Sequence, residues 1–325
     1  MDNLPTLDDI RDAVTAIDGI AWRTPLVPSA LGVLLKLESL QPIGAFKLRG
    51  AAYAISKLDD AQKARGVVCA STGNHGRAVA YAAGRLGIRA TVCLSTLVPD
   101  VKVNAIKALG AEVWRGGTTQ EDAEREAGRL VAEEGWVDIP AFDHPDVIAG
   151  QGTIGLELFE DRPDLETLIV PMSGGGLIAG IAIAAKAIKP SVRVVGVTMD
   201  RGAAMAESLA AGRVVDVEEL PTLADSLGGG IPGNRYTFRL CQRFVDEAVL
   251  VTEQEIYRGM AALLKEGVIA EGGGAVGYAA VLAGKIEPVG PTAIVVSGRN
   301  VDMTRLCDIA AGRHLTVGDV VVGPG

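Results

Sequence analysis

The feature that most constrains the fold is a repeated alternation between short apolar runs and alanine-rich stretches. The runs lie at residues 66–70, 90–94, 111–114, 167–171, 192–197 and 293–296. Between them, stretches such as 76–86 and 101–109 carry apolar residues at helical spacing. Strands that are apolar on both faces and are separated by helices are typical of βαβ units. The pattern therefore predicts an α/β fold with open, mainly parallel sheets.

Length and charge narrow the class of function. The 325 residues suffice for two domains, and no apolar stretch approaches the roughly 20 residues that a membrane span needs. The first 20 residues are rich in aspartate and resemble a capped helix rather than a secretory signal, so a cytoplasmic protein is expected. The formal charge of -9 argues against a nucleic-acid partner, because such binding needs a basic surface.

The cysteines Cys69, Cys93, Cys241 and Cys307 are scattered and form no CxxC pair, so a zinc site is not expected. Cys69 and Cys93 lie inside apolar runs, which favours buried, reduced thiols. After about residue 315 the chain is predicted to end in a short Gly/Val-rich tail.

Glycine-rich turns at 71–76, 173–177 and 271–275 each follow an apolar run and lead into an alanine-rich helix. In an open parallel sheet, ligands bind beyond the carboxyl ends of the strands. The turn at 173–177 suits a compact phosphate, because glycine lets the backbone approach a ligand and a helix N-terminus attracts anions. It has neither the Walker A ending nor the GxGxxG spacing. A tight connection without a ligand is the alternative.

The turn at 71–76 offers the side chains of Ser71, Thr72, Asn74 and His75. Together with backbone N–H groups, this set can hold a carboxylate while Asn74 faces a phenolate-like oxygen. The alternative is a helix start capped by a hydroxyl group. His75 fits a structural histidine better than a general base.

Lys47 lies between Phe46 and Leu48 in the run Gly-Ala-Phe-Lys-Leu-Arg-Gly. A lysine flanked in this way can be desolvated and lose its proton, which a Schiff base requires. The alternative is an ordinary exposed lysine.

Six motifs are similar to those of one family and occur in the same order. They are GAFKLRG at 44–50, STGNHG at 71–76, PDVIAGQGT at 145–153, SGGGL at 173–177, EGGGA at 271–275 and SGRN at 297–300. The chain resembles the fold-type II pyridoxal 5'-phosphate (PLP) enzymes, in the group of the serine/threonine dehydratases and serine racemase. The resemblance runs from about residue 24 to 302 and implies PLP as the cofactor.

The resemblance also implies roles for individual residues. Lys47 would hold PLP and remove the substrate's Cα proton, Phe46 would pack on the cofactor ring, Asn74 would bond its 3' oxygen and Ser297 its pyridine nitrogen. Two sets complete the site: Ser173, Gly174, Gly175, Gly176 and Leu177 around the phosphate, and Ser71, Thr72, Asn74 and His75 at the substrate carboxylate.

The implied reaction is elimination of the β-hydroxyl of a hydroxy amino acid, which yields an oxo acid and ammonia. A serine at the pyridine nitrogen leaves the ring neutral, which favours loss of the leaving group over a long-lived carbanion. An amino-acid racemase is the alternative, with Thr72 as the acid on the far face of the substrate. A PLP-binding protein without turnover is the non-enzymatic alternative.

Three departures from the family pattern matter, at Ser173, Thr72 and Thr198. Thr72 stands where racemases have serine and where threonine dehydratases often have alanine. Ser173 replaces the first glycine of the phosphate turn. Thr198 stands where many relatives have a cation-binding glutamate, so no metal site is expected, and Asp200 fits a solvated turn better than a shifted ligand. The stretches 200–205, 221–230 and 297–303 resemble the hydroxyectoine-utilisation dehydratases, which implies a substrate derived from hydroxyectoine rather than threonine itself.

Two domains are predicted. Residues 1–57 and 139–325 would form a large domain that holds PLP, and residues 58–138 a small mobile domain that carries the 71–76 loop. The resemblance implies a homodimer.

Overall fold

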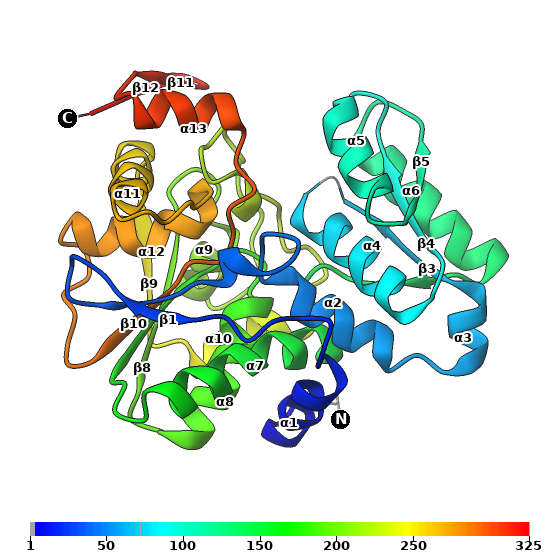
Figure 1. Cartoon of the computed structure of the whole chain (residues 1–325), viewed down its shortest axis with the longest axis horizontal. Coiled ribbons are helices and arrows are strands. Elements are labelled where there is room, and N and C mark those ends of the chain that lie inside the picture. The colour runs from blue at the N-terminus through cyan, green and yellow to red at the C-terminus, as the bar shows by residue number, and fades with distance from the viewer. Residues whose placement is uncertain (1–3, 72, 325) are drawn as a thin grey trace.

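The computed structural model describes residues 4–71 and 73–324. Within this part of the chain the larger sheet has the strand order β1-β2-β10-β7-β8-β9 (Figure 1). Its strands are β1 (Leu26–Pro28), β2 (Leu34–Lys36), β7 (Thr167–Pro171), β8 (Arg193–Met199), β9 (Glu247–Val251) and β10 (Thr292–Val295). β1 pairs antiparallel with β2, whereas the other pairings are parallel.

The smaller sheet has the order β5-β4-β3-β6, and all of its pairings are parallel. Its strands are β3 (Val67–Ala70), β4 (Ala90–Leu94), β5 (Glu112–Arg115) and β6 (Val137–Asp138). These strands fall within the predicted small domain, although the domain boundaries themselves stay a prediction. The α/β class with mainly parallel sheets is confirmed.

Helices cover both faces of each sheet because successive strand residues point to opposite sides. In β7, Leu168 and Val170 join one apolar cluster with α7 (Pro145–Asp161), α8 (Gly176–Ile188) and α10 (Thr237–Phe244). Ile169 joins a second cluster with α11 (Glu253–Lys265) and α12 (Gly272–Leu282). In the smaller sheet, α4 (Asn74–Leu86) covers one face and α6 (Gln120–Arg129) the other.

Helix α2 (Lys47–Ser56) lies between the two sheets, where it packs against α7 and α4 (Figure 1). The crossing with α7 admits no side chain at two positions. A Cβ on Gly50 would lie 2.7 Å from the carbonyl oxygen of Val147, and a Cβ on Gly150 would lie 2.6 Å from that of Arg49. One apolar cluster therefore runs from α7 and α8 through α2 into α4 and β3.

A buried ionic cluster holds the start of α2. The guanidinium of Arg49 lies 2.8 Å from the carboxylate of Glu38 and 2.6 Å from that of Glu157, and the amine of Lys36 lies 2.5 Å from Glu157. Glu38 belongs to the short helix η1 (Glu38–Leu40). All four side chains are buried or nearly so, and their formal charges balance.

The remaining elements complete the surface of the molecule. They are α1 (Leu7–Ala16), α3 (Asp60–Arg65), α5 (Asp100–Lys107), η2 (Leu130–Glu134), α9 (Ala204–Ala211), η3 (Asp225–Leu227) and α13 (Met303–Ala310). Thr6 caps α1, as the capped helix predicted for this segment requires. No helix in the described residues is long and apolar enough to cross a bilayer.

The structure corrects the prediction of a C-terminal tail. Residues after 314 form an antiparallel hairpin of β11 (Leu315–Val317) and β12 (Val320–Val322). Val317 and Val322 are buried in the cluster beneath α11, so this hairpin is packed rather than loose. The sequence signals for strands here were the alternation Leu315-Thr316-Val317 and the run of β-branched residues Val320–Val322.

Candidate active site

Lys47 is the first residue of α2, and backbone pairing holds it beside the end of β10. The N–H of Phe46 donates to the carbonyl oxygen of Ser297 at 3.0 Å, and Ala45 forms a bridge with Gly298. The amine of Lys47 donates to the carbonyl oxygen of Ala141 at 2.6 Å. Burial lowers the pKa of this amine to about 8. A desolvated lysine of this kind is what the sequence predicted.

Two aromatic rings flank the Lys47 amine. Its nitrogen lies 5.4 Å from the ring centroid of Phe46 and 6.0 Å from that of Phe142. The ring of Phe142 also packs against the glycine-rich turn at 173–177, because a Cβ on Gly174 would lie 2.5 Å from it. Phe142 thus connects Lys47 to the glycine-rich turn.

The turn at 173–177 connects β7 to α8. Gly175 has a φ of 87°, a backbone conformation that residues other than glycine rarely adopt. A Cβ on Gly176 would lie 2.9 Å from the carbonyl oxygen of Phe142. In the described residues we find no hydrogen-bond acceptor for the N–H groups of Ser173, Gly174, Gly175 and Gly176. Unpaired N–H groups at a helix start suit an anion such as a phosphate.

The loop at 71–76 lies between β3 and α4. Ser71 accepts a hydrogen bond of 3.4 Å from the N–H of Gly73, and Asn74 begins the helix. Asn74 Nδ2 donates to Glu271 at 2.8 Å, and Asn74 Oδ1 accepts from Asn300 Nδ2 at 2.6 Å. These contacts bring the loop to the segments that contain Glu271 and Ser297. Thr72, predicted as a catalytic and substrate-binding residue, lies outside the described residues.

His75 is buried, and its Nε2 lies 2.6 Å from the carbonyl oxygen of Ile139. Burial lowers the pKa of the imidazole to about 3, so the ring is neutral and its N–H donates to this carbonyl. The contact supports the structural role that the sequence favoured over a general base.

Ser297 follows β10 and is 4% exposed. The pairing of Phe46 with its carbonyl group sets it close to Lys47 in space, although 250 residues separate them in the chain. Leu177, in the first turn of α8, is buried in the same apolar cluster as α2 and α7. The predicted residues that the structure describes thus gather around the start of α2, the end of β10, the glycine turn and the 71–76 loop.

The cysteines, and Thr198 at the position where many relatives have a cation-binding glutamate, lie apart from this arrangement. Cys69, Cys93 and Cys241 are buried free thiols, which confirms the prediction for the first two, whereas Cys307 on α13 is exposed. Burial raises the pKa of Cys93 and Cys241 to about 12. Thr198 is buried and Asp200 is exposed, and the described residues contain no group of three or more His, Cys, Asp or Glu side chains that could hold a metal ion.

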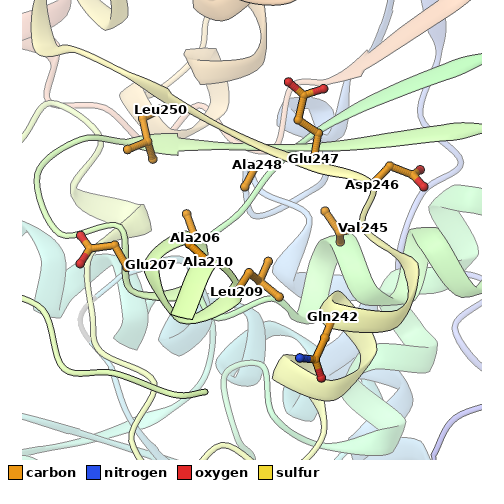
Figure 2. A pocket seen from close by; sticks show the side chains of 10 residues that line it. All are labelled: Ala206, Glu207, Leu209, Ala210, Gln242, Val245, Asp246, Glu247, Ala248 and Leu250. Carbon is orange, nitrogen blue, oxygen red and sulfur yellow. The ribbon is translucent and has the colours of Figure 1, made fainter. Parts of the chain in front are cut away.

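A surface pocket of about 490 Å³ lies elsewhere, beside the edge strand β9 (Figure 2). Side chains of α9, α10 and β9 line it, among them Glu207, Gln242 and Leu250. None of the residues predicted from the motifs lies in this pocket.

A family model described as "Pyridoxal-phosphate dependent enzyme" matches residues 17–298. This chain belongs to that family. It is 51% identical over 308 residues to a putative threonine dehydratase of Sinorhizobium fredii, across 92% of this chain and 93% of the relative. It is 43% identical over 310 residues to an L-threonine ammonia-lyase of Thermotoga maritima, across 93% of this chain and 77% of the relative. The structure of maize serine racemase matches with a TM-score of 0.88 and 36% identity, across 94% of this chain and 96% of that one.

The residues present fit pyridoxal phosphate. A buried amine with a pKa near neutrality, unpaired N–H groups at a glycine turn and a buried serine lie around one place. The predicted cofactor and the fold-type II assignment are confirmed by the family and by the structural match. The role of each residue toward the cofactor stays a prediction.

The prediction from sequence did not include Phe142, Ala141, Glu271 and Asn300 among the site residues. Glu271 and Asn300 lie within two of the six family motifs, beside glycines that follow apolar runs. This position could have indicated that they belong to the site. Ala141 and Phe142 had no such signal, because they lie in an irregular segment before α7.

Proposed function

We propose that this protein is an ammonia-lyase that eliminates the β-hydroxyl of a hydroxy amino acid and releases an oxo acid and ammonia. The observation that carries the proposal is the buried amine of Lys47, whose pKa is lowered to about 8 at the start of α2. The names of the Sinorhizobium and Thermotoga relatives point to the same class of reaction. Pyridoxal phosphate, when bound, supplies the electron sink that makes the substrate's Cα proton removable.

The chain's own residues supply binding and proton transfer. Lys47 is the base for the Cα proton, because an amine with a pKa near neutrality can both take and return a proton at physiological pH. The N–H groups of the turn at 173–177 would hold the phosphate. The loop at 71–76 would hold the substrate carboxylate. Ser297 offers a hydroxyl group rather than a carboxylate to the pyridine nitrogen, so no anion there would keep that nitrogen protonated.

The substrate belongs to the β-hydroxy amino acids, and we propose a hydroxyectoine-derived compound in particular. Two of the three stretches behind this proposal lie at the site. The stretch 297–303 contains Ser297 and Asn300, and the stretch 221–230 packs on the start of α12, where a Cβ on Gly272 would lie 2.1 Å from the carbonyl oxygen of Leu223. The two stretches on which this proposal rests are therefore close to Glu271 and Asn300.

The test of the reaction class uses purified wild type and Lys47→Ala. The wild type should take up added pyridoxal phosphate, turn yellow and release oxo acid from at least one β-hydroxy amino acid, whereas Lys47→Ala should hold no covalently attached cofactor and show no turnover. Lys57→Ala, which removes an exposed lysine that pairs with Asp12, is the matched control and should behave as the wild type. A wild type that binds no pyridoxal phosphate would refute the proposal.

The substrate is identified by a screen of threonine, serine and hydroxyectoine-derived amino acids for oxo-acid release. Turnover of threonine or serine far above the hydroxyectoine-derived set would reject the finer proposal and leave the reaction class intact.

Racemisation is the second candidate, favoured by the 36% identity to maize serine racemase over 94% of this chain. Measuring D-isomer formation alongside oxo-acid release from the same substrate separates the two reactions. Excess of the D-isomer would replace the lyase proposal. The predicted homodimer and the cytoplasmic location also stay predictions, and sedimentation equilibrium would test the first.

A further inference from the structure

Four polar side chains form a hydrogen-bonded chain. It connects α4, which covers the smaller sheet, to the residue before α12 and to the segment that follows β10 of the larger sheet. Arg77 Nη1 donates to Asn300 Oδ1 at 2.8 Å, Asn300 Nδ2 donates to Asn74 Oδ1 at 2.6 Å, and Asn74 Nδ2 donates to Glu271 Oε1 at 2.8 Å. Arg77 and Asn74 lie one turn apart on α4. Glu271 precedes α12, and Asn300 follows the Ser297 segment.

The two ends of this chain fix its direction. A guanidinium can only donate hydrogen bonds, and a carboxylate can only accept them. With Arg77 at one end, Asn300 must present its oxygen to the guanidinium and its nitrogen to Asn74. With Glu271 at the other end, Asn74 must present its nitrogen to the carboxylate. The orientation of both amides, which otherwise has two options, is therefore determined by their neighbours.

Further contacts reinforce the same direction. Asn300 Nδ2 also donates to the carbonyl oxygen of Ile43 at 2.9 Å, which uses its second hydrogen on another pure acceptor. The second oxygen of Glu271 accepts from the backbone N–H of Asn300 at 3.1 Å, and the hydroxyl of Ser226 also donates to this carboxylate. Glu271 is 5% exposed, so water does not compete freely for these bonds.

One hydrogen of the Asn74 amide is left over. Its oxygen is used by Asn300 and one N–H by Glu271, and in the described residues we find no acceptor for the other N–H. Asn74 thus still has one N–H to donate, and a cofactor atom that faces this N–H must be a hydrogen-bond acceptor. A negatively polarised oxygen on the cofactor ring is the group that such a donor recognises.

We propose that Glu271, Asn300 and Arg77 are positioning residues that orient the Asn74 amide, so that its remaining N–H faces the ring oxygen of pyridoxal phosphate. The inference rests on the proposed function, because it takes Asn74 as a cofactor ligand. It assigns to three further residues a role in setting the polarity of one hydrogen bond.

The test compares Glu271→Gln and Asn300→Asp with Arg77→Lys as the control. Glutamine at 271 can donate as well as accept, so it no longer holds the Asn74 amide in one direction. Aspartate at 300 replaces the donor that faces Asn74 Oδ1 with another acceptor. Lysine at 77 remains a pure donor and preserves the direction of the chain. The measurements are the visible absorption band of the bound cofactor and its pH dependence, the cofactor affinity, and the melting temperature.

We expect a shifted cofactor band and an affinity for pyridoxal phosphate about tenfold lower in Glu271→Gln and in Asn300→Asp, since one hydrogen bond is weakened. Arg77→Lys should keep the band of the wild type. A lower melting temperature with an unchanged band in the first two variants would mean that the residues only join the two sheets, and would overturn the inference.

The outcomes separate this inference from the proposed function. A wild type that takes up no pyridoxal phosphate refutes both. A wild type that binds the cofactor and turns over substrate, beside Glu271→Gln and Asn300→Asp with wild-type bands, refutes the inference alone. Circular dichroism shows whether each variant is folded, and if one is not, the other decides.

Discussion

At the scale of single residues, the proposed chemistry depends on the desolvation of one amine, that of Lys47. The sequence indicated this from Phe46 and Leu48, the apolar neighbours of Lys47. It did not indicate the carbonyl group of Ala141, which accepts from Lys47 although 94 residues separate the two. Local sequence reports what flanks a side chain along the chain, whereas its environment is set by residues that only the fold brings near.

The lowered pKa of Lys47 predicts how the apoprotein captures its cofactor. Only the neutral amine attacks an aldehyde, so the rate of covalent attachment should rise about tenfold per pH unit below 8 and level off above it, because burial lowers the pKa to about 8. Stopped-flow absorbance of apoprotein mixed with pyridoxal phosphate measures this rate. A free lysine derivative in the same buffers should keep rising toward about pH 10.4. A protein curve that follows the free lysine would contradict the burial of this amine.

The buried ionic cluster around Arg49 predicts a large loss of stability. Arg49→Met leaves the carboxylates of Glu38 and Glu157 with less compensation, so the free energy of unfolding should fall by about 3–5 kcal/mol. Urea denaturation measures the change. Arg162→Met, which removes an exposed pair with Asp164, is the control and should change the free energy of unfolding far less, because solvent screens exposed ion pairs. Equal effects of the two variants would show that burial of the cluster adds nothing.

At the scale of elements, the glycine turn between β7 and α8 joins the cofactor site to the packing around it. Gly174 and Gly176 contact Phe142, and a Cβ on Gly175 would lie 2.8 Å from Met205 Cε. A side chain added to the turn would therefore overlap its neighbours, and the turn or those neighbours would have to shift. The turn is packed on one side against the irregular segment before α7 and on the other against α9 and α10, and these contacts set its shape.

Gly174→Ala should accordingly weaken cofactor binding. The added methyl group would lie 2.5 Å from the ring of Phe142 and push the turn away from its present position. We expect at least a tenfold loss of affinity for pyridoxal phosphate, since displaced N–H groups lose charge-assisted hydrogen bonds. Fluorescence titration measures the affinity. Gly128→Ala is the matched control: this exposed glycine in α6 has nothing near its Cβ position, so alanine should leave binding unchanged and stabilise the helix slightly.

The elements were predictable where the apolar signal is strong. All six runs named from the sequence are strands, with ends that differ by at most two residues. The strands that were missed are short or mixed in polarity: β1, β2, β6, β9, β11 and β12. Strand β9, for example, exposes Glu247 and Ala248 at the edge of its sheet. Strand order was not predictable at all, since it depends on pairings between distant segments.

At the scale of the whole molecule, the two sheets share one apolar cluster, which runs through α2. The chain should therefore unfold in a single transition despite its two sheets. In a Trp22→Phe variant, the tryptophans left are Trp114 on β5 and Trp136, just before β6, so fluorescence reports on the smaller sheet. Its urea transition should coincide with that seen by far-UV circular dichroism. Separate midpoints would show that the smaller sheet unfolds alone.

The close crossing of α2 with α7 has a consequence for how such enzymes can be recombined. Gly50 and Gly150 leave no space for a side chain between the two helices, and the cluster around them continues into α4. Exchanging the segment 58–138 for that of a relative would cut through a packed interior rather than along a linker. Chimaeras at this boundary should thus fold only when the two parental sequences match at α2, α4 and α7. The segment that can be exchanged without loss of packing is therefore larger than the smaller sheet and its helices.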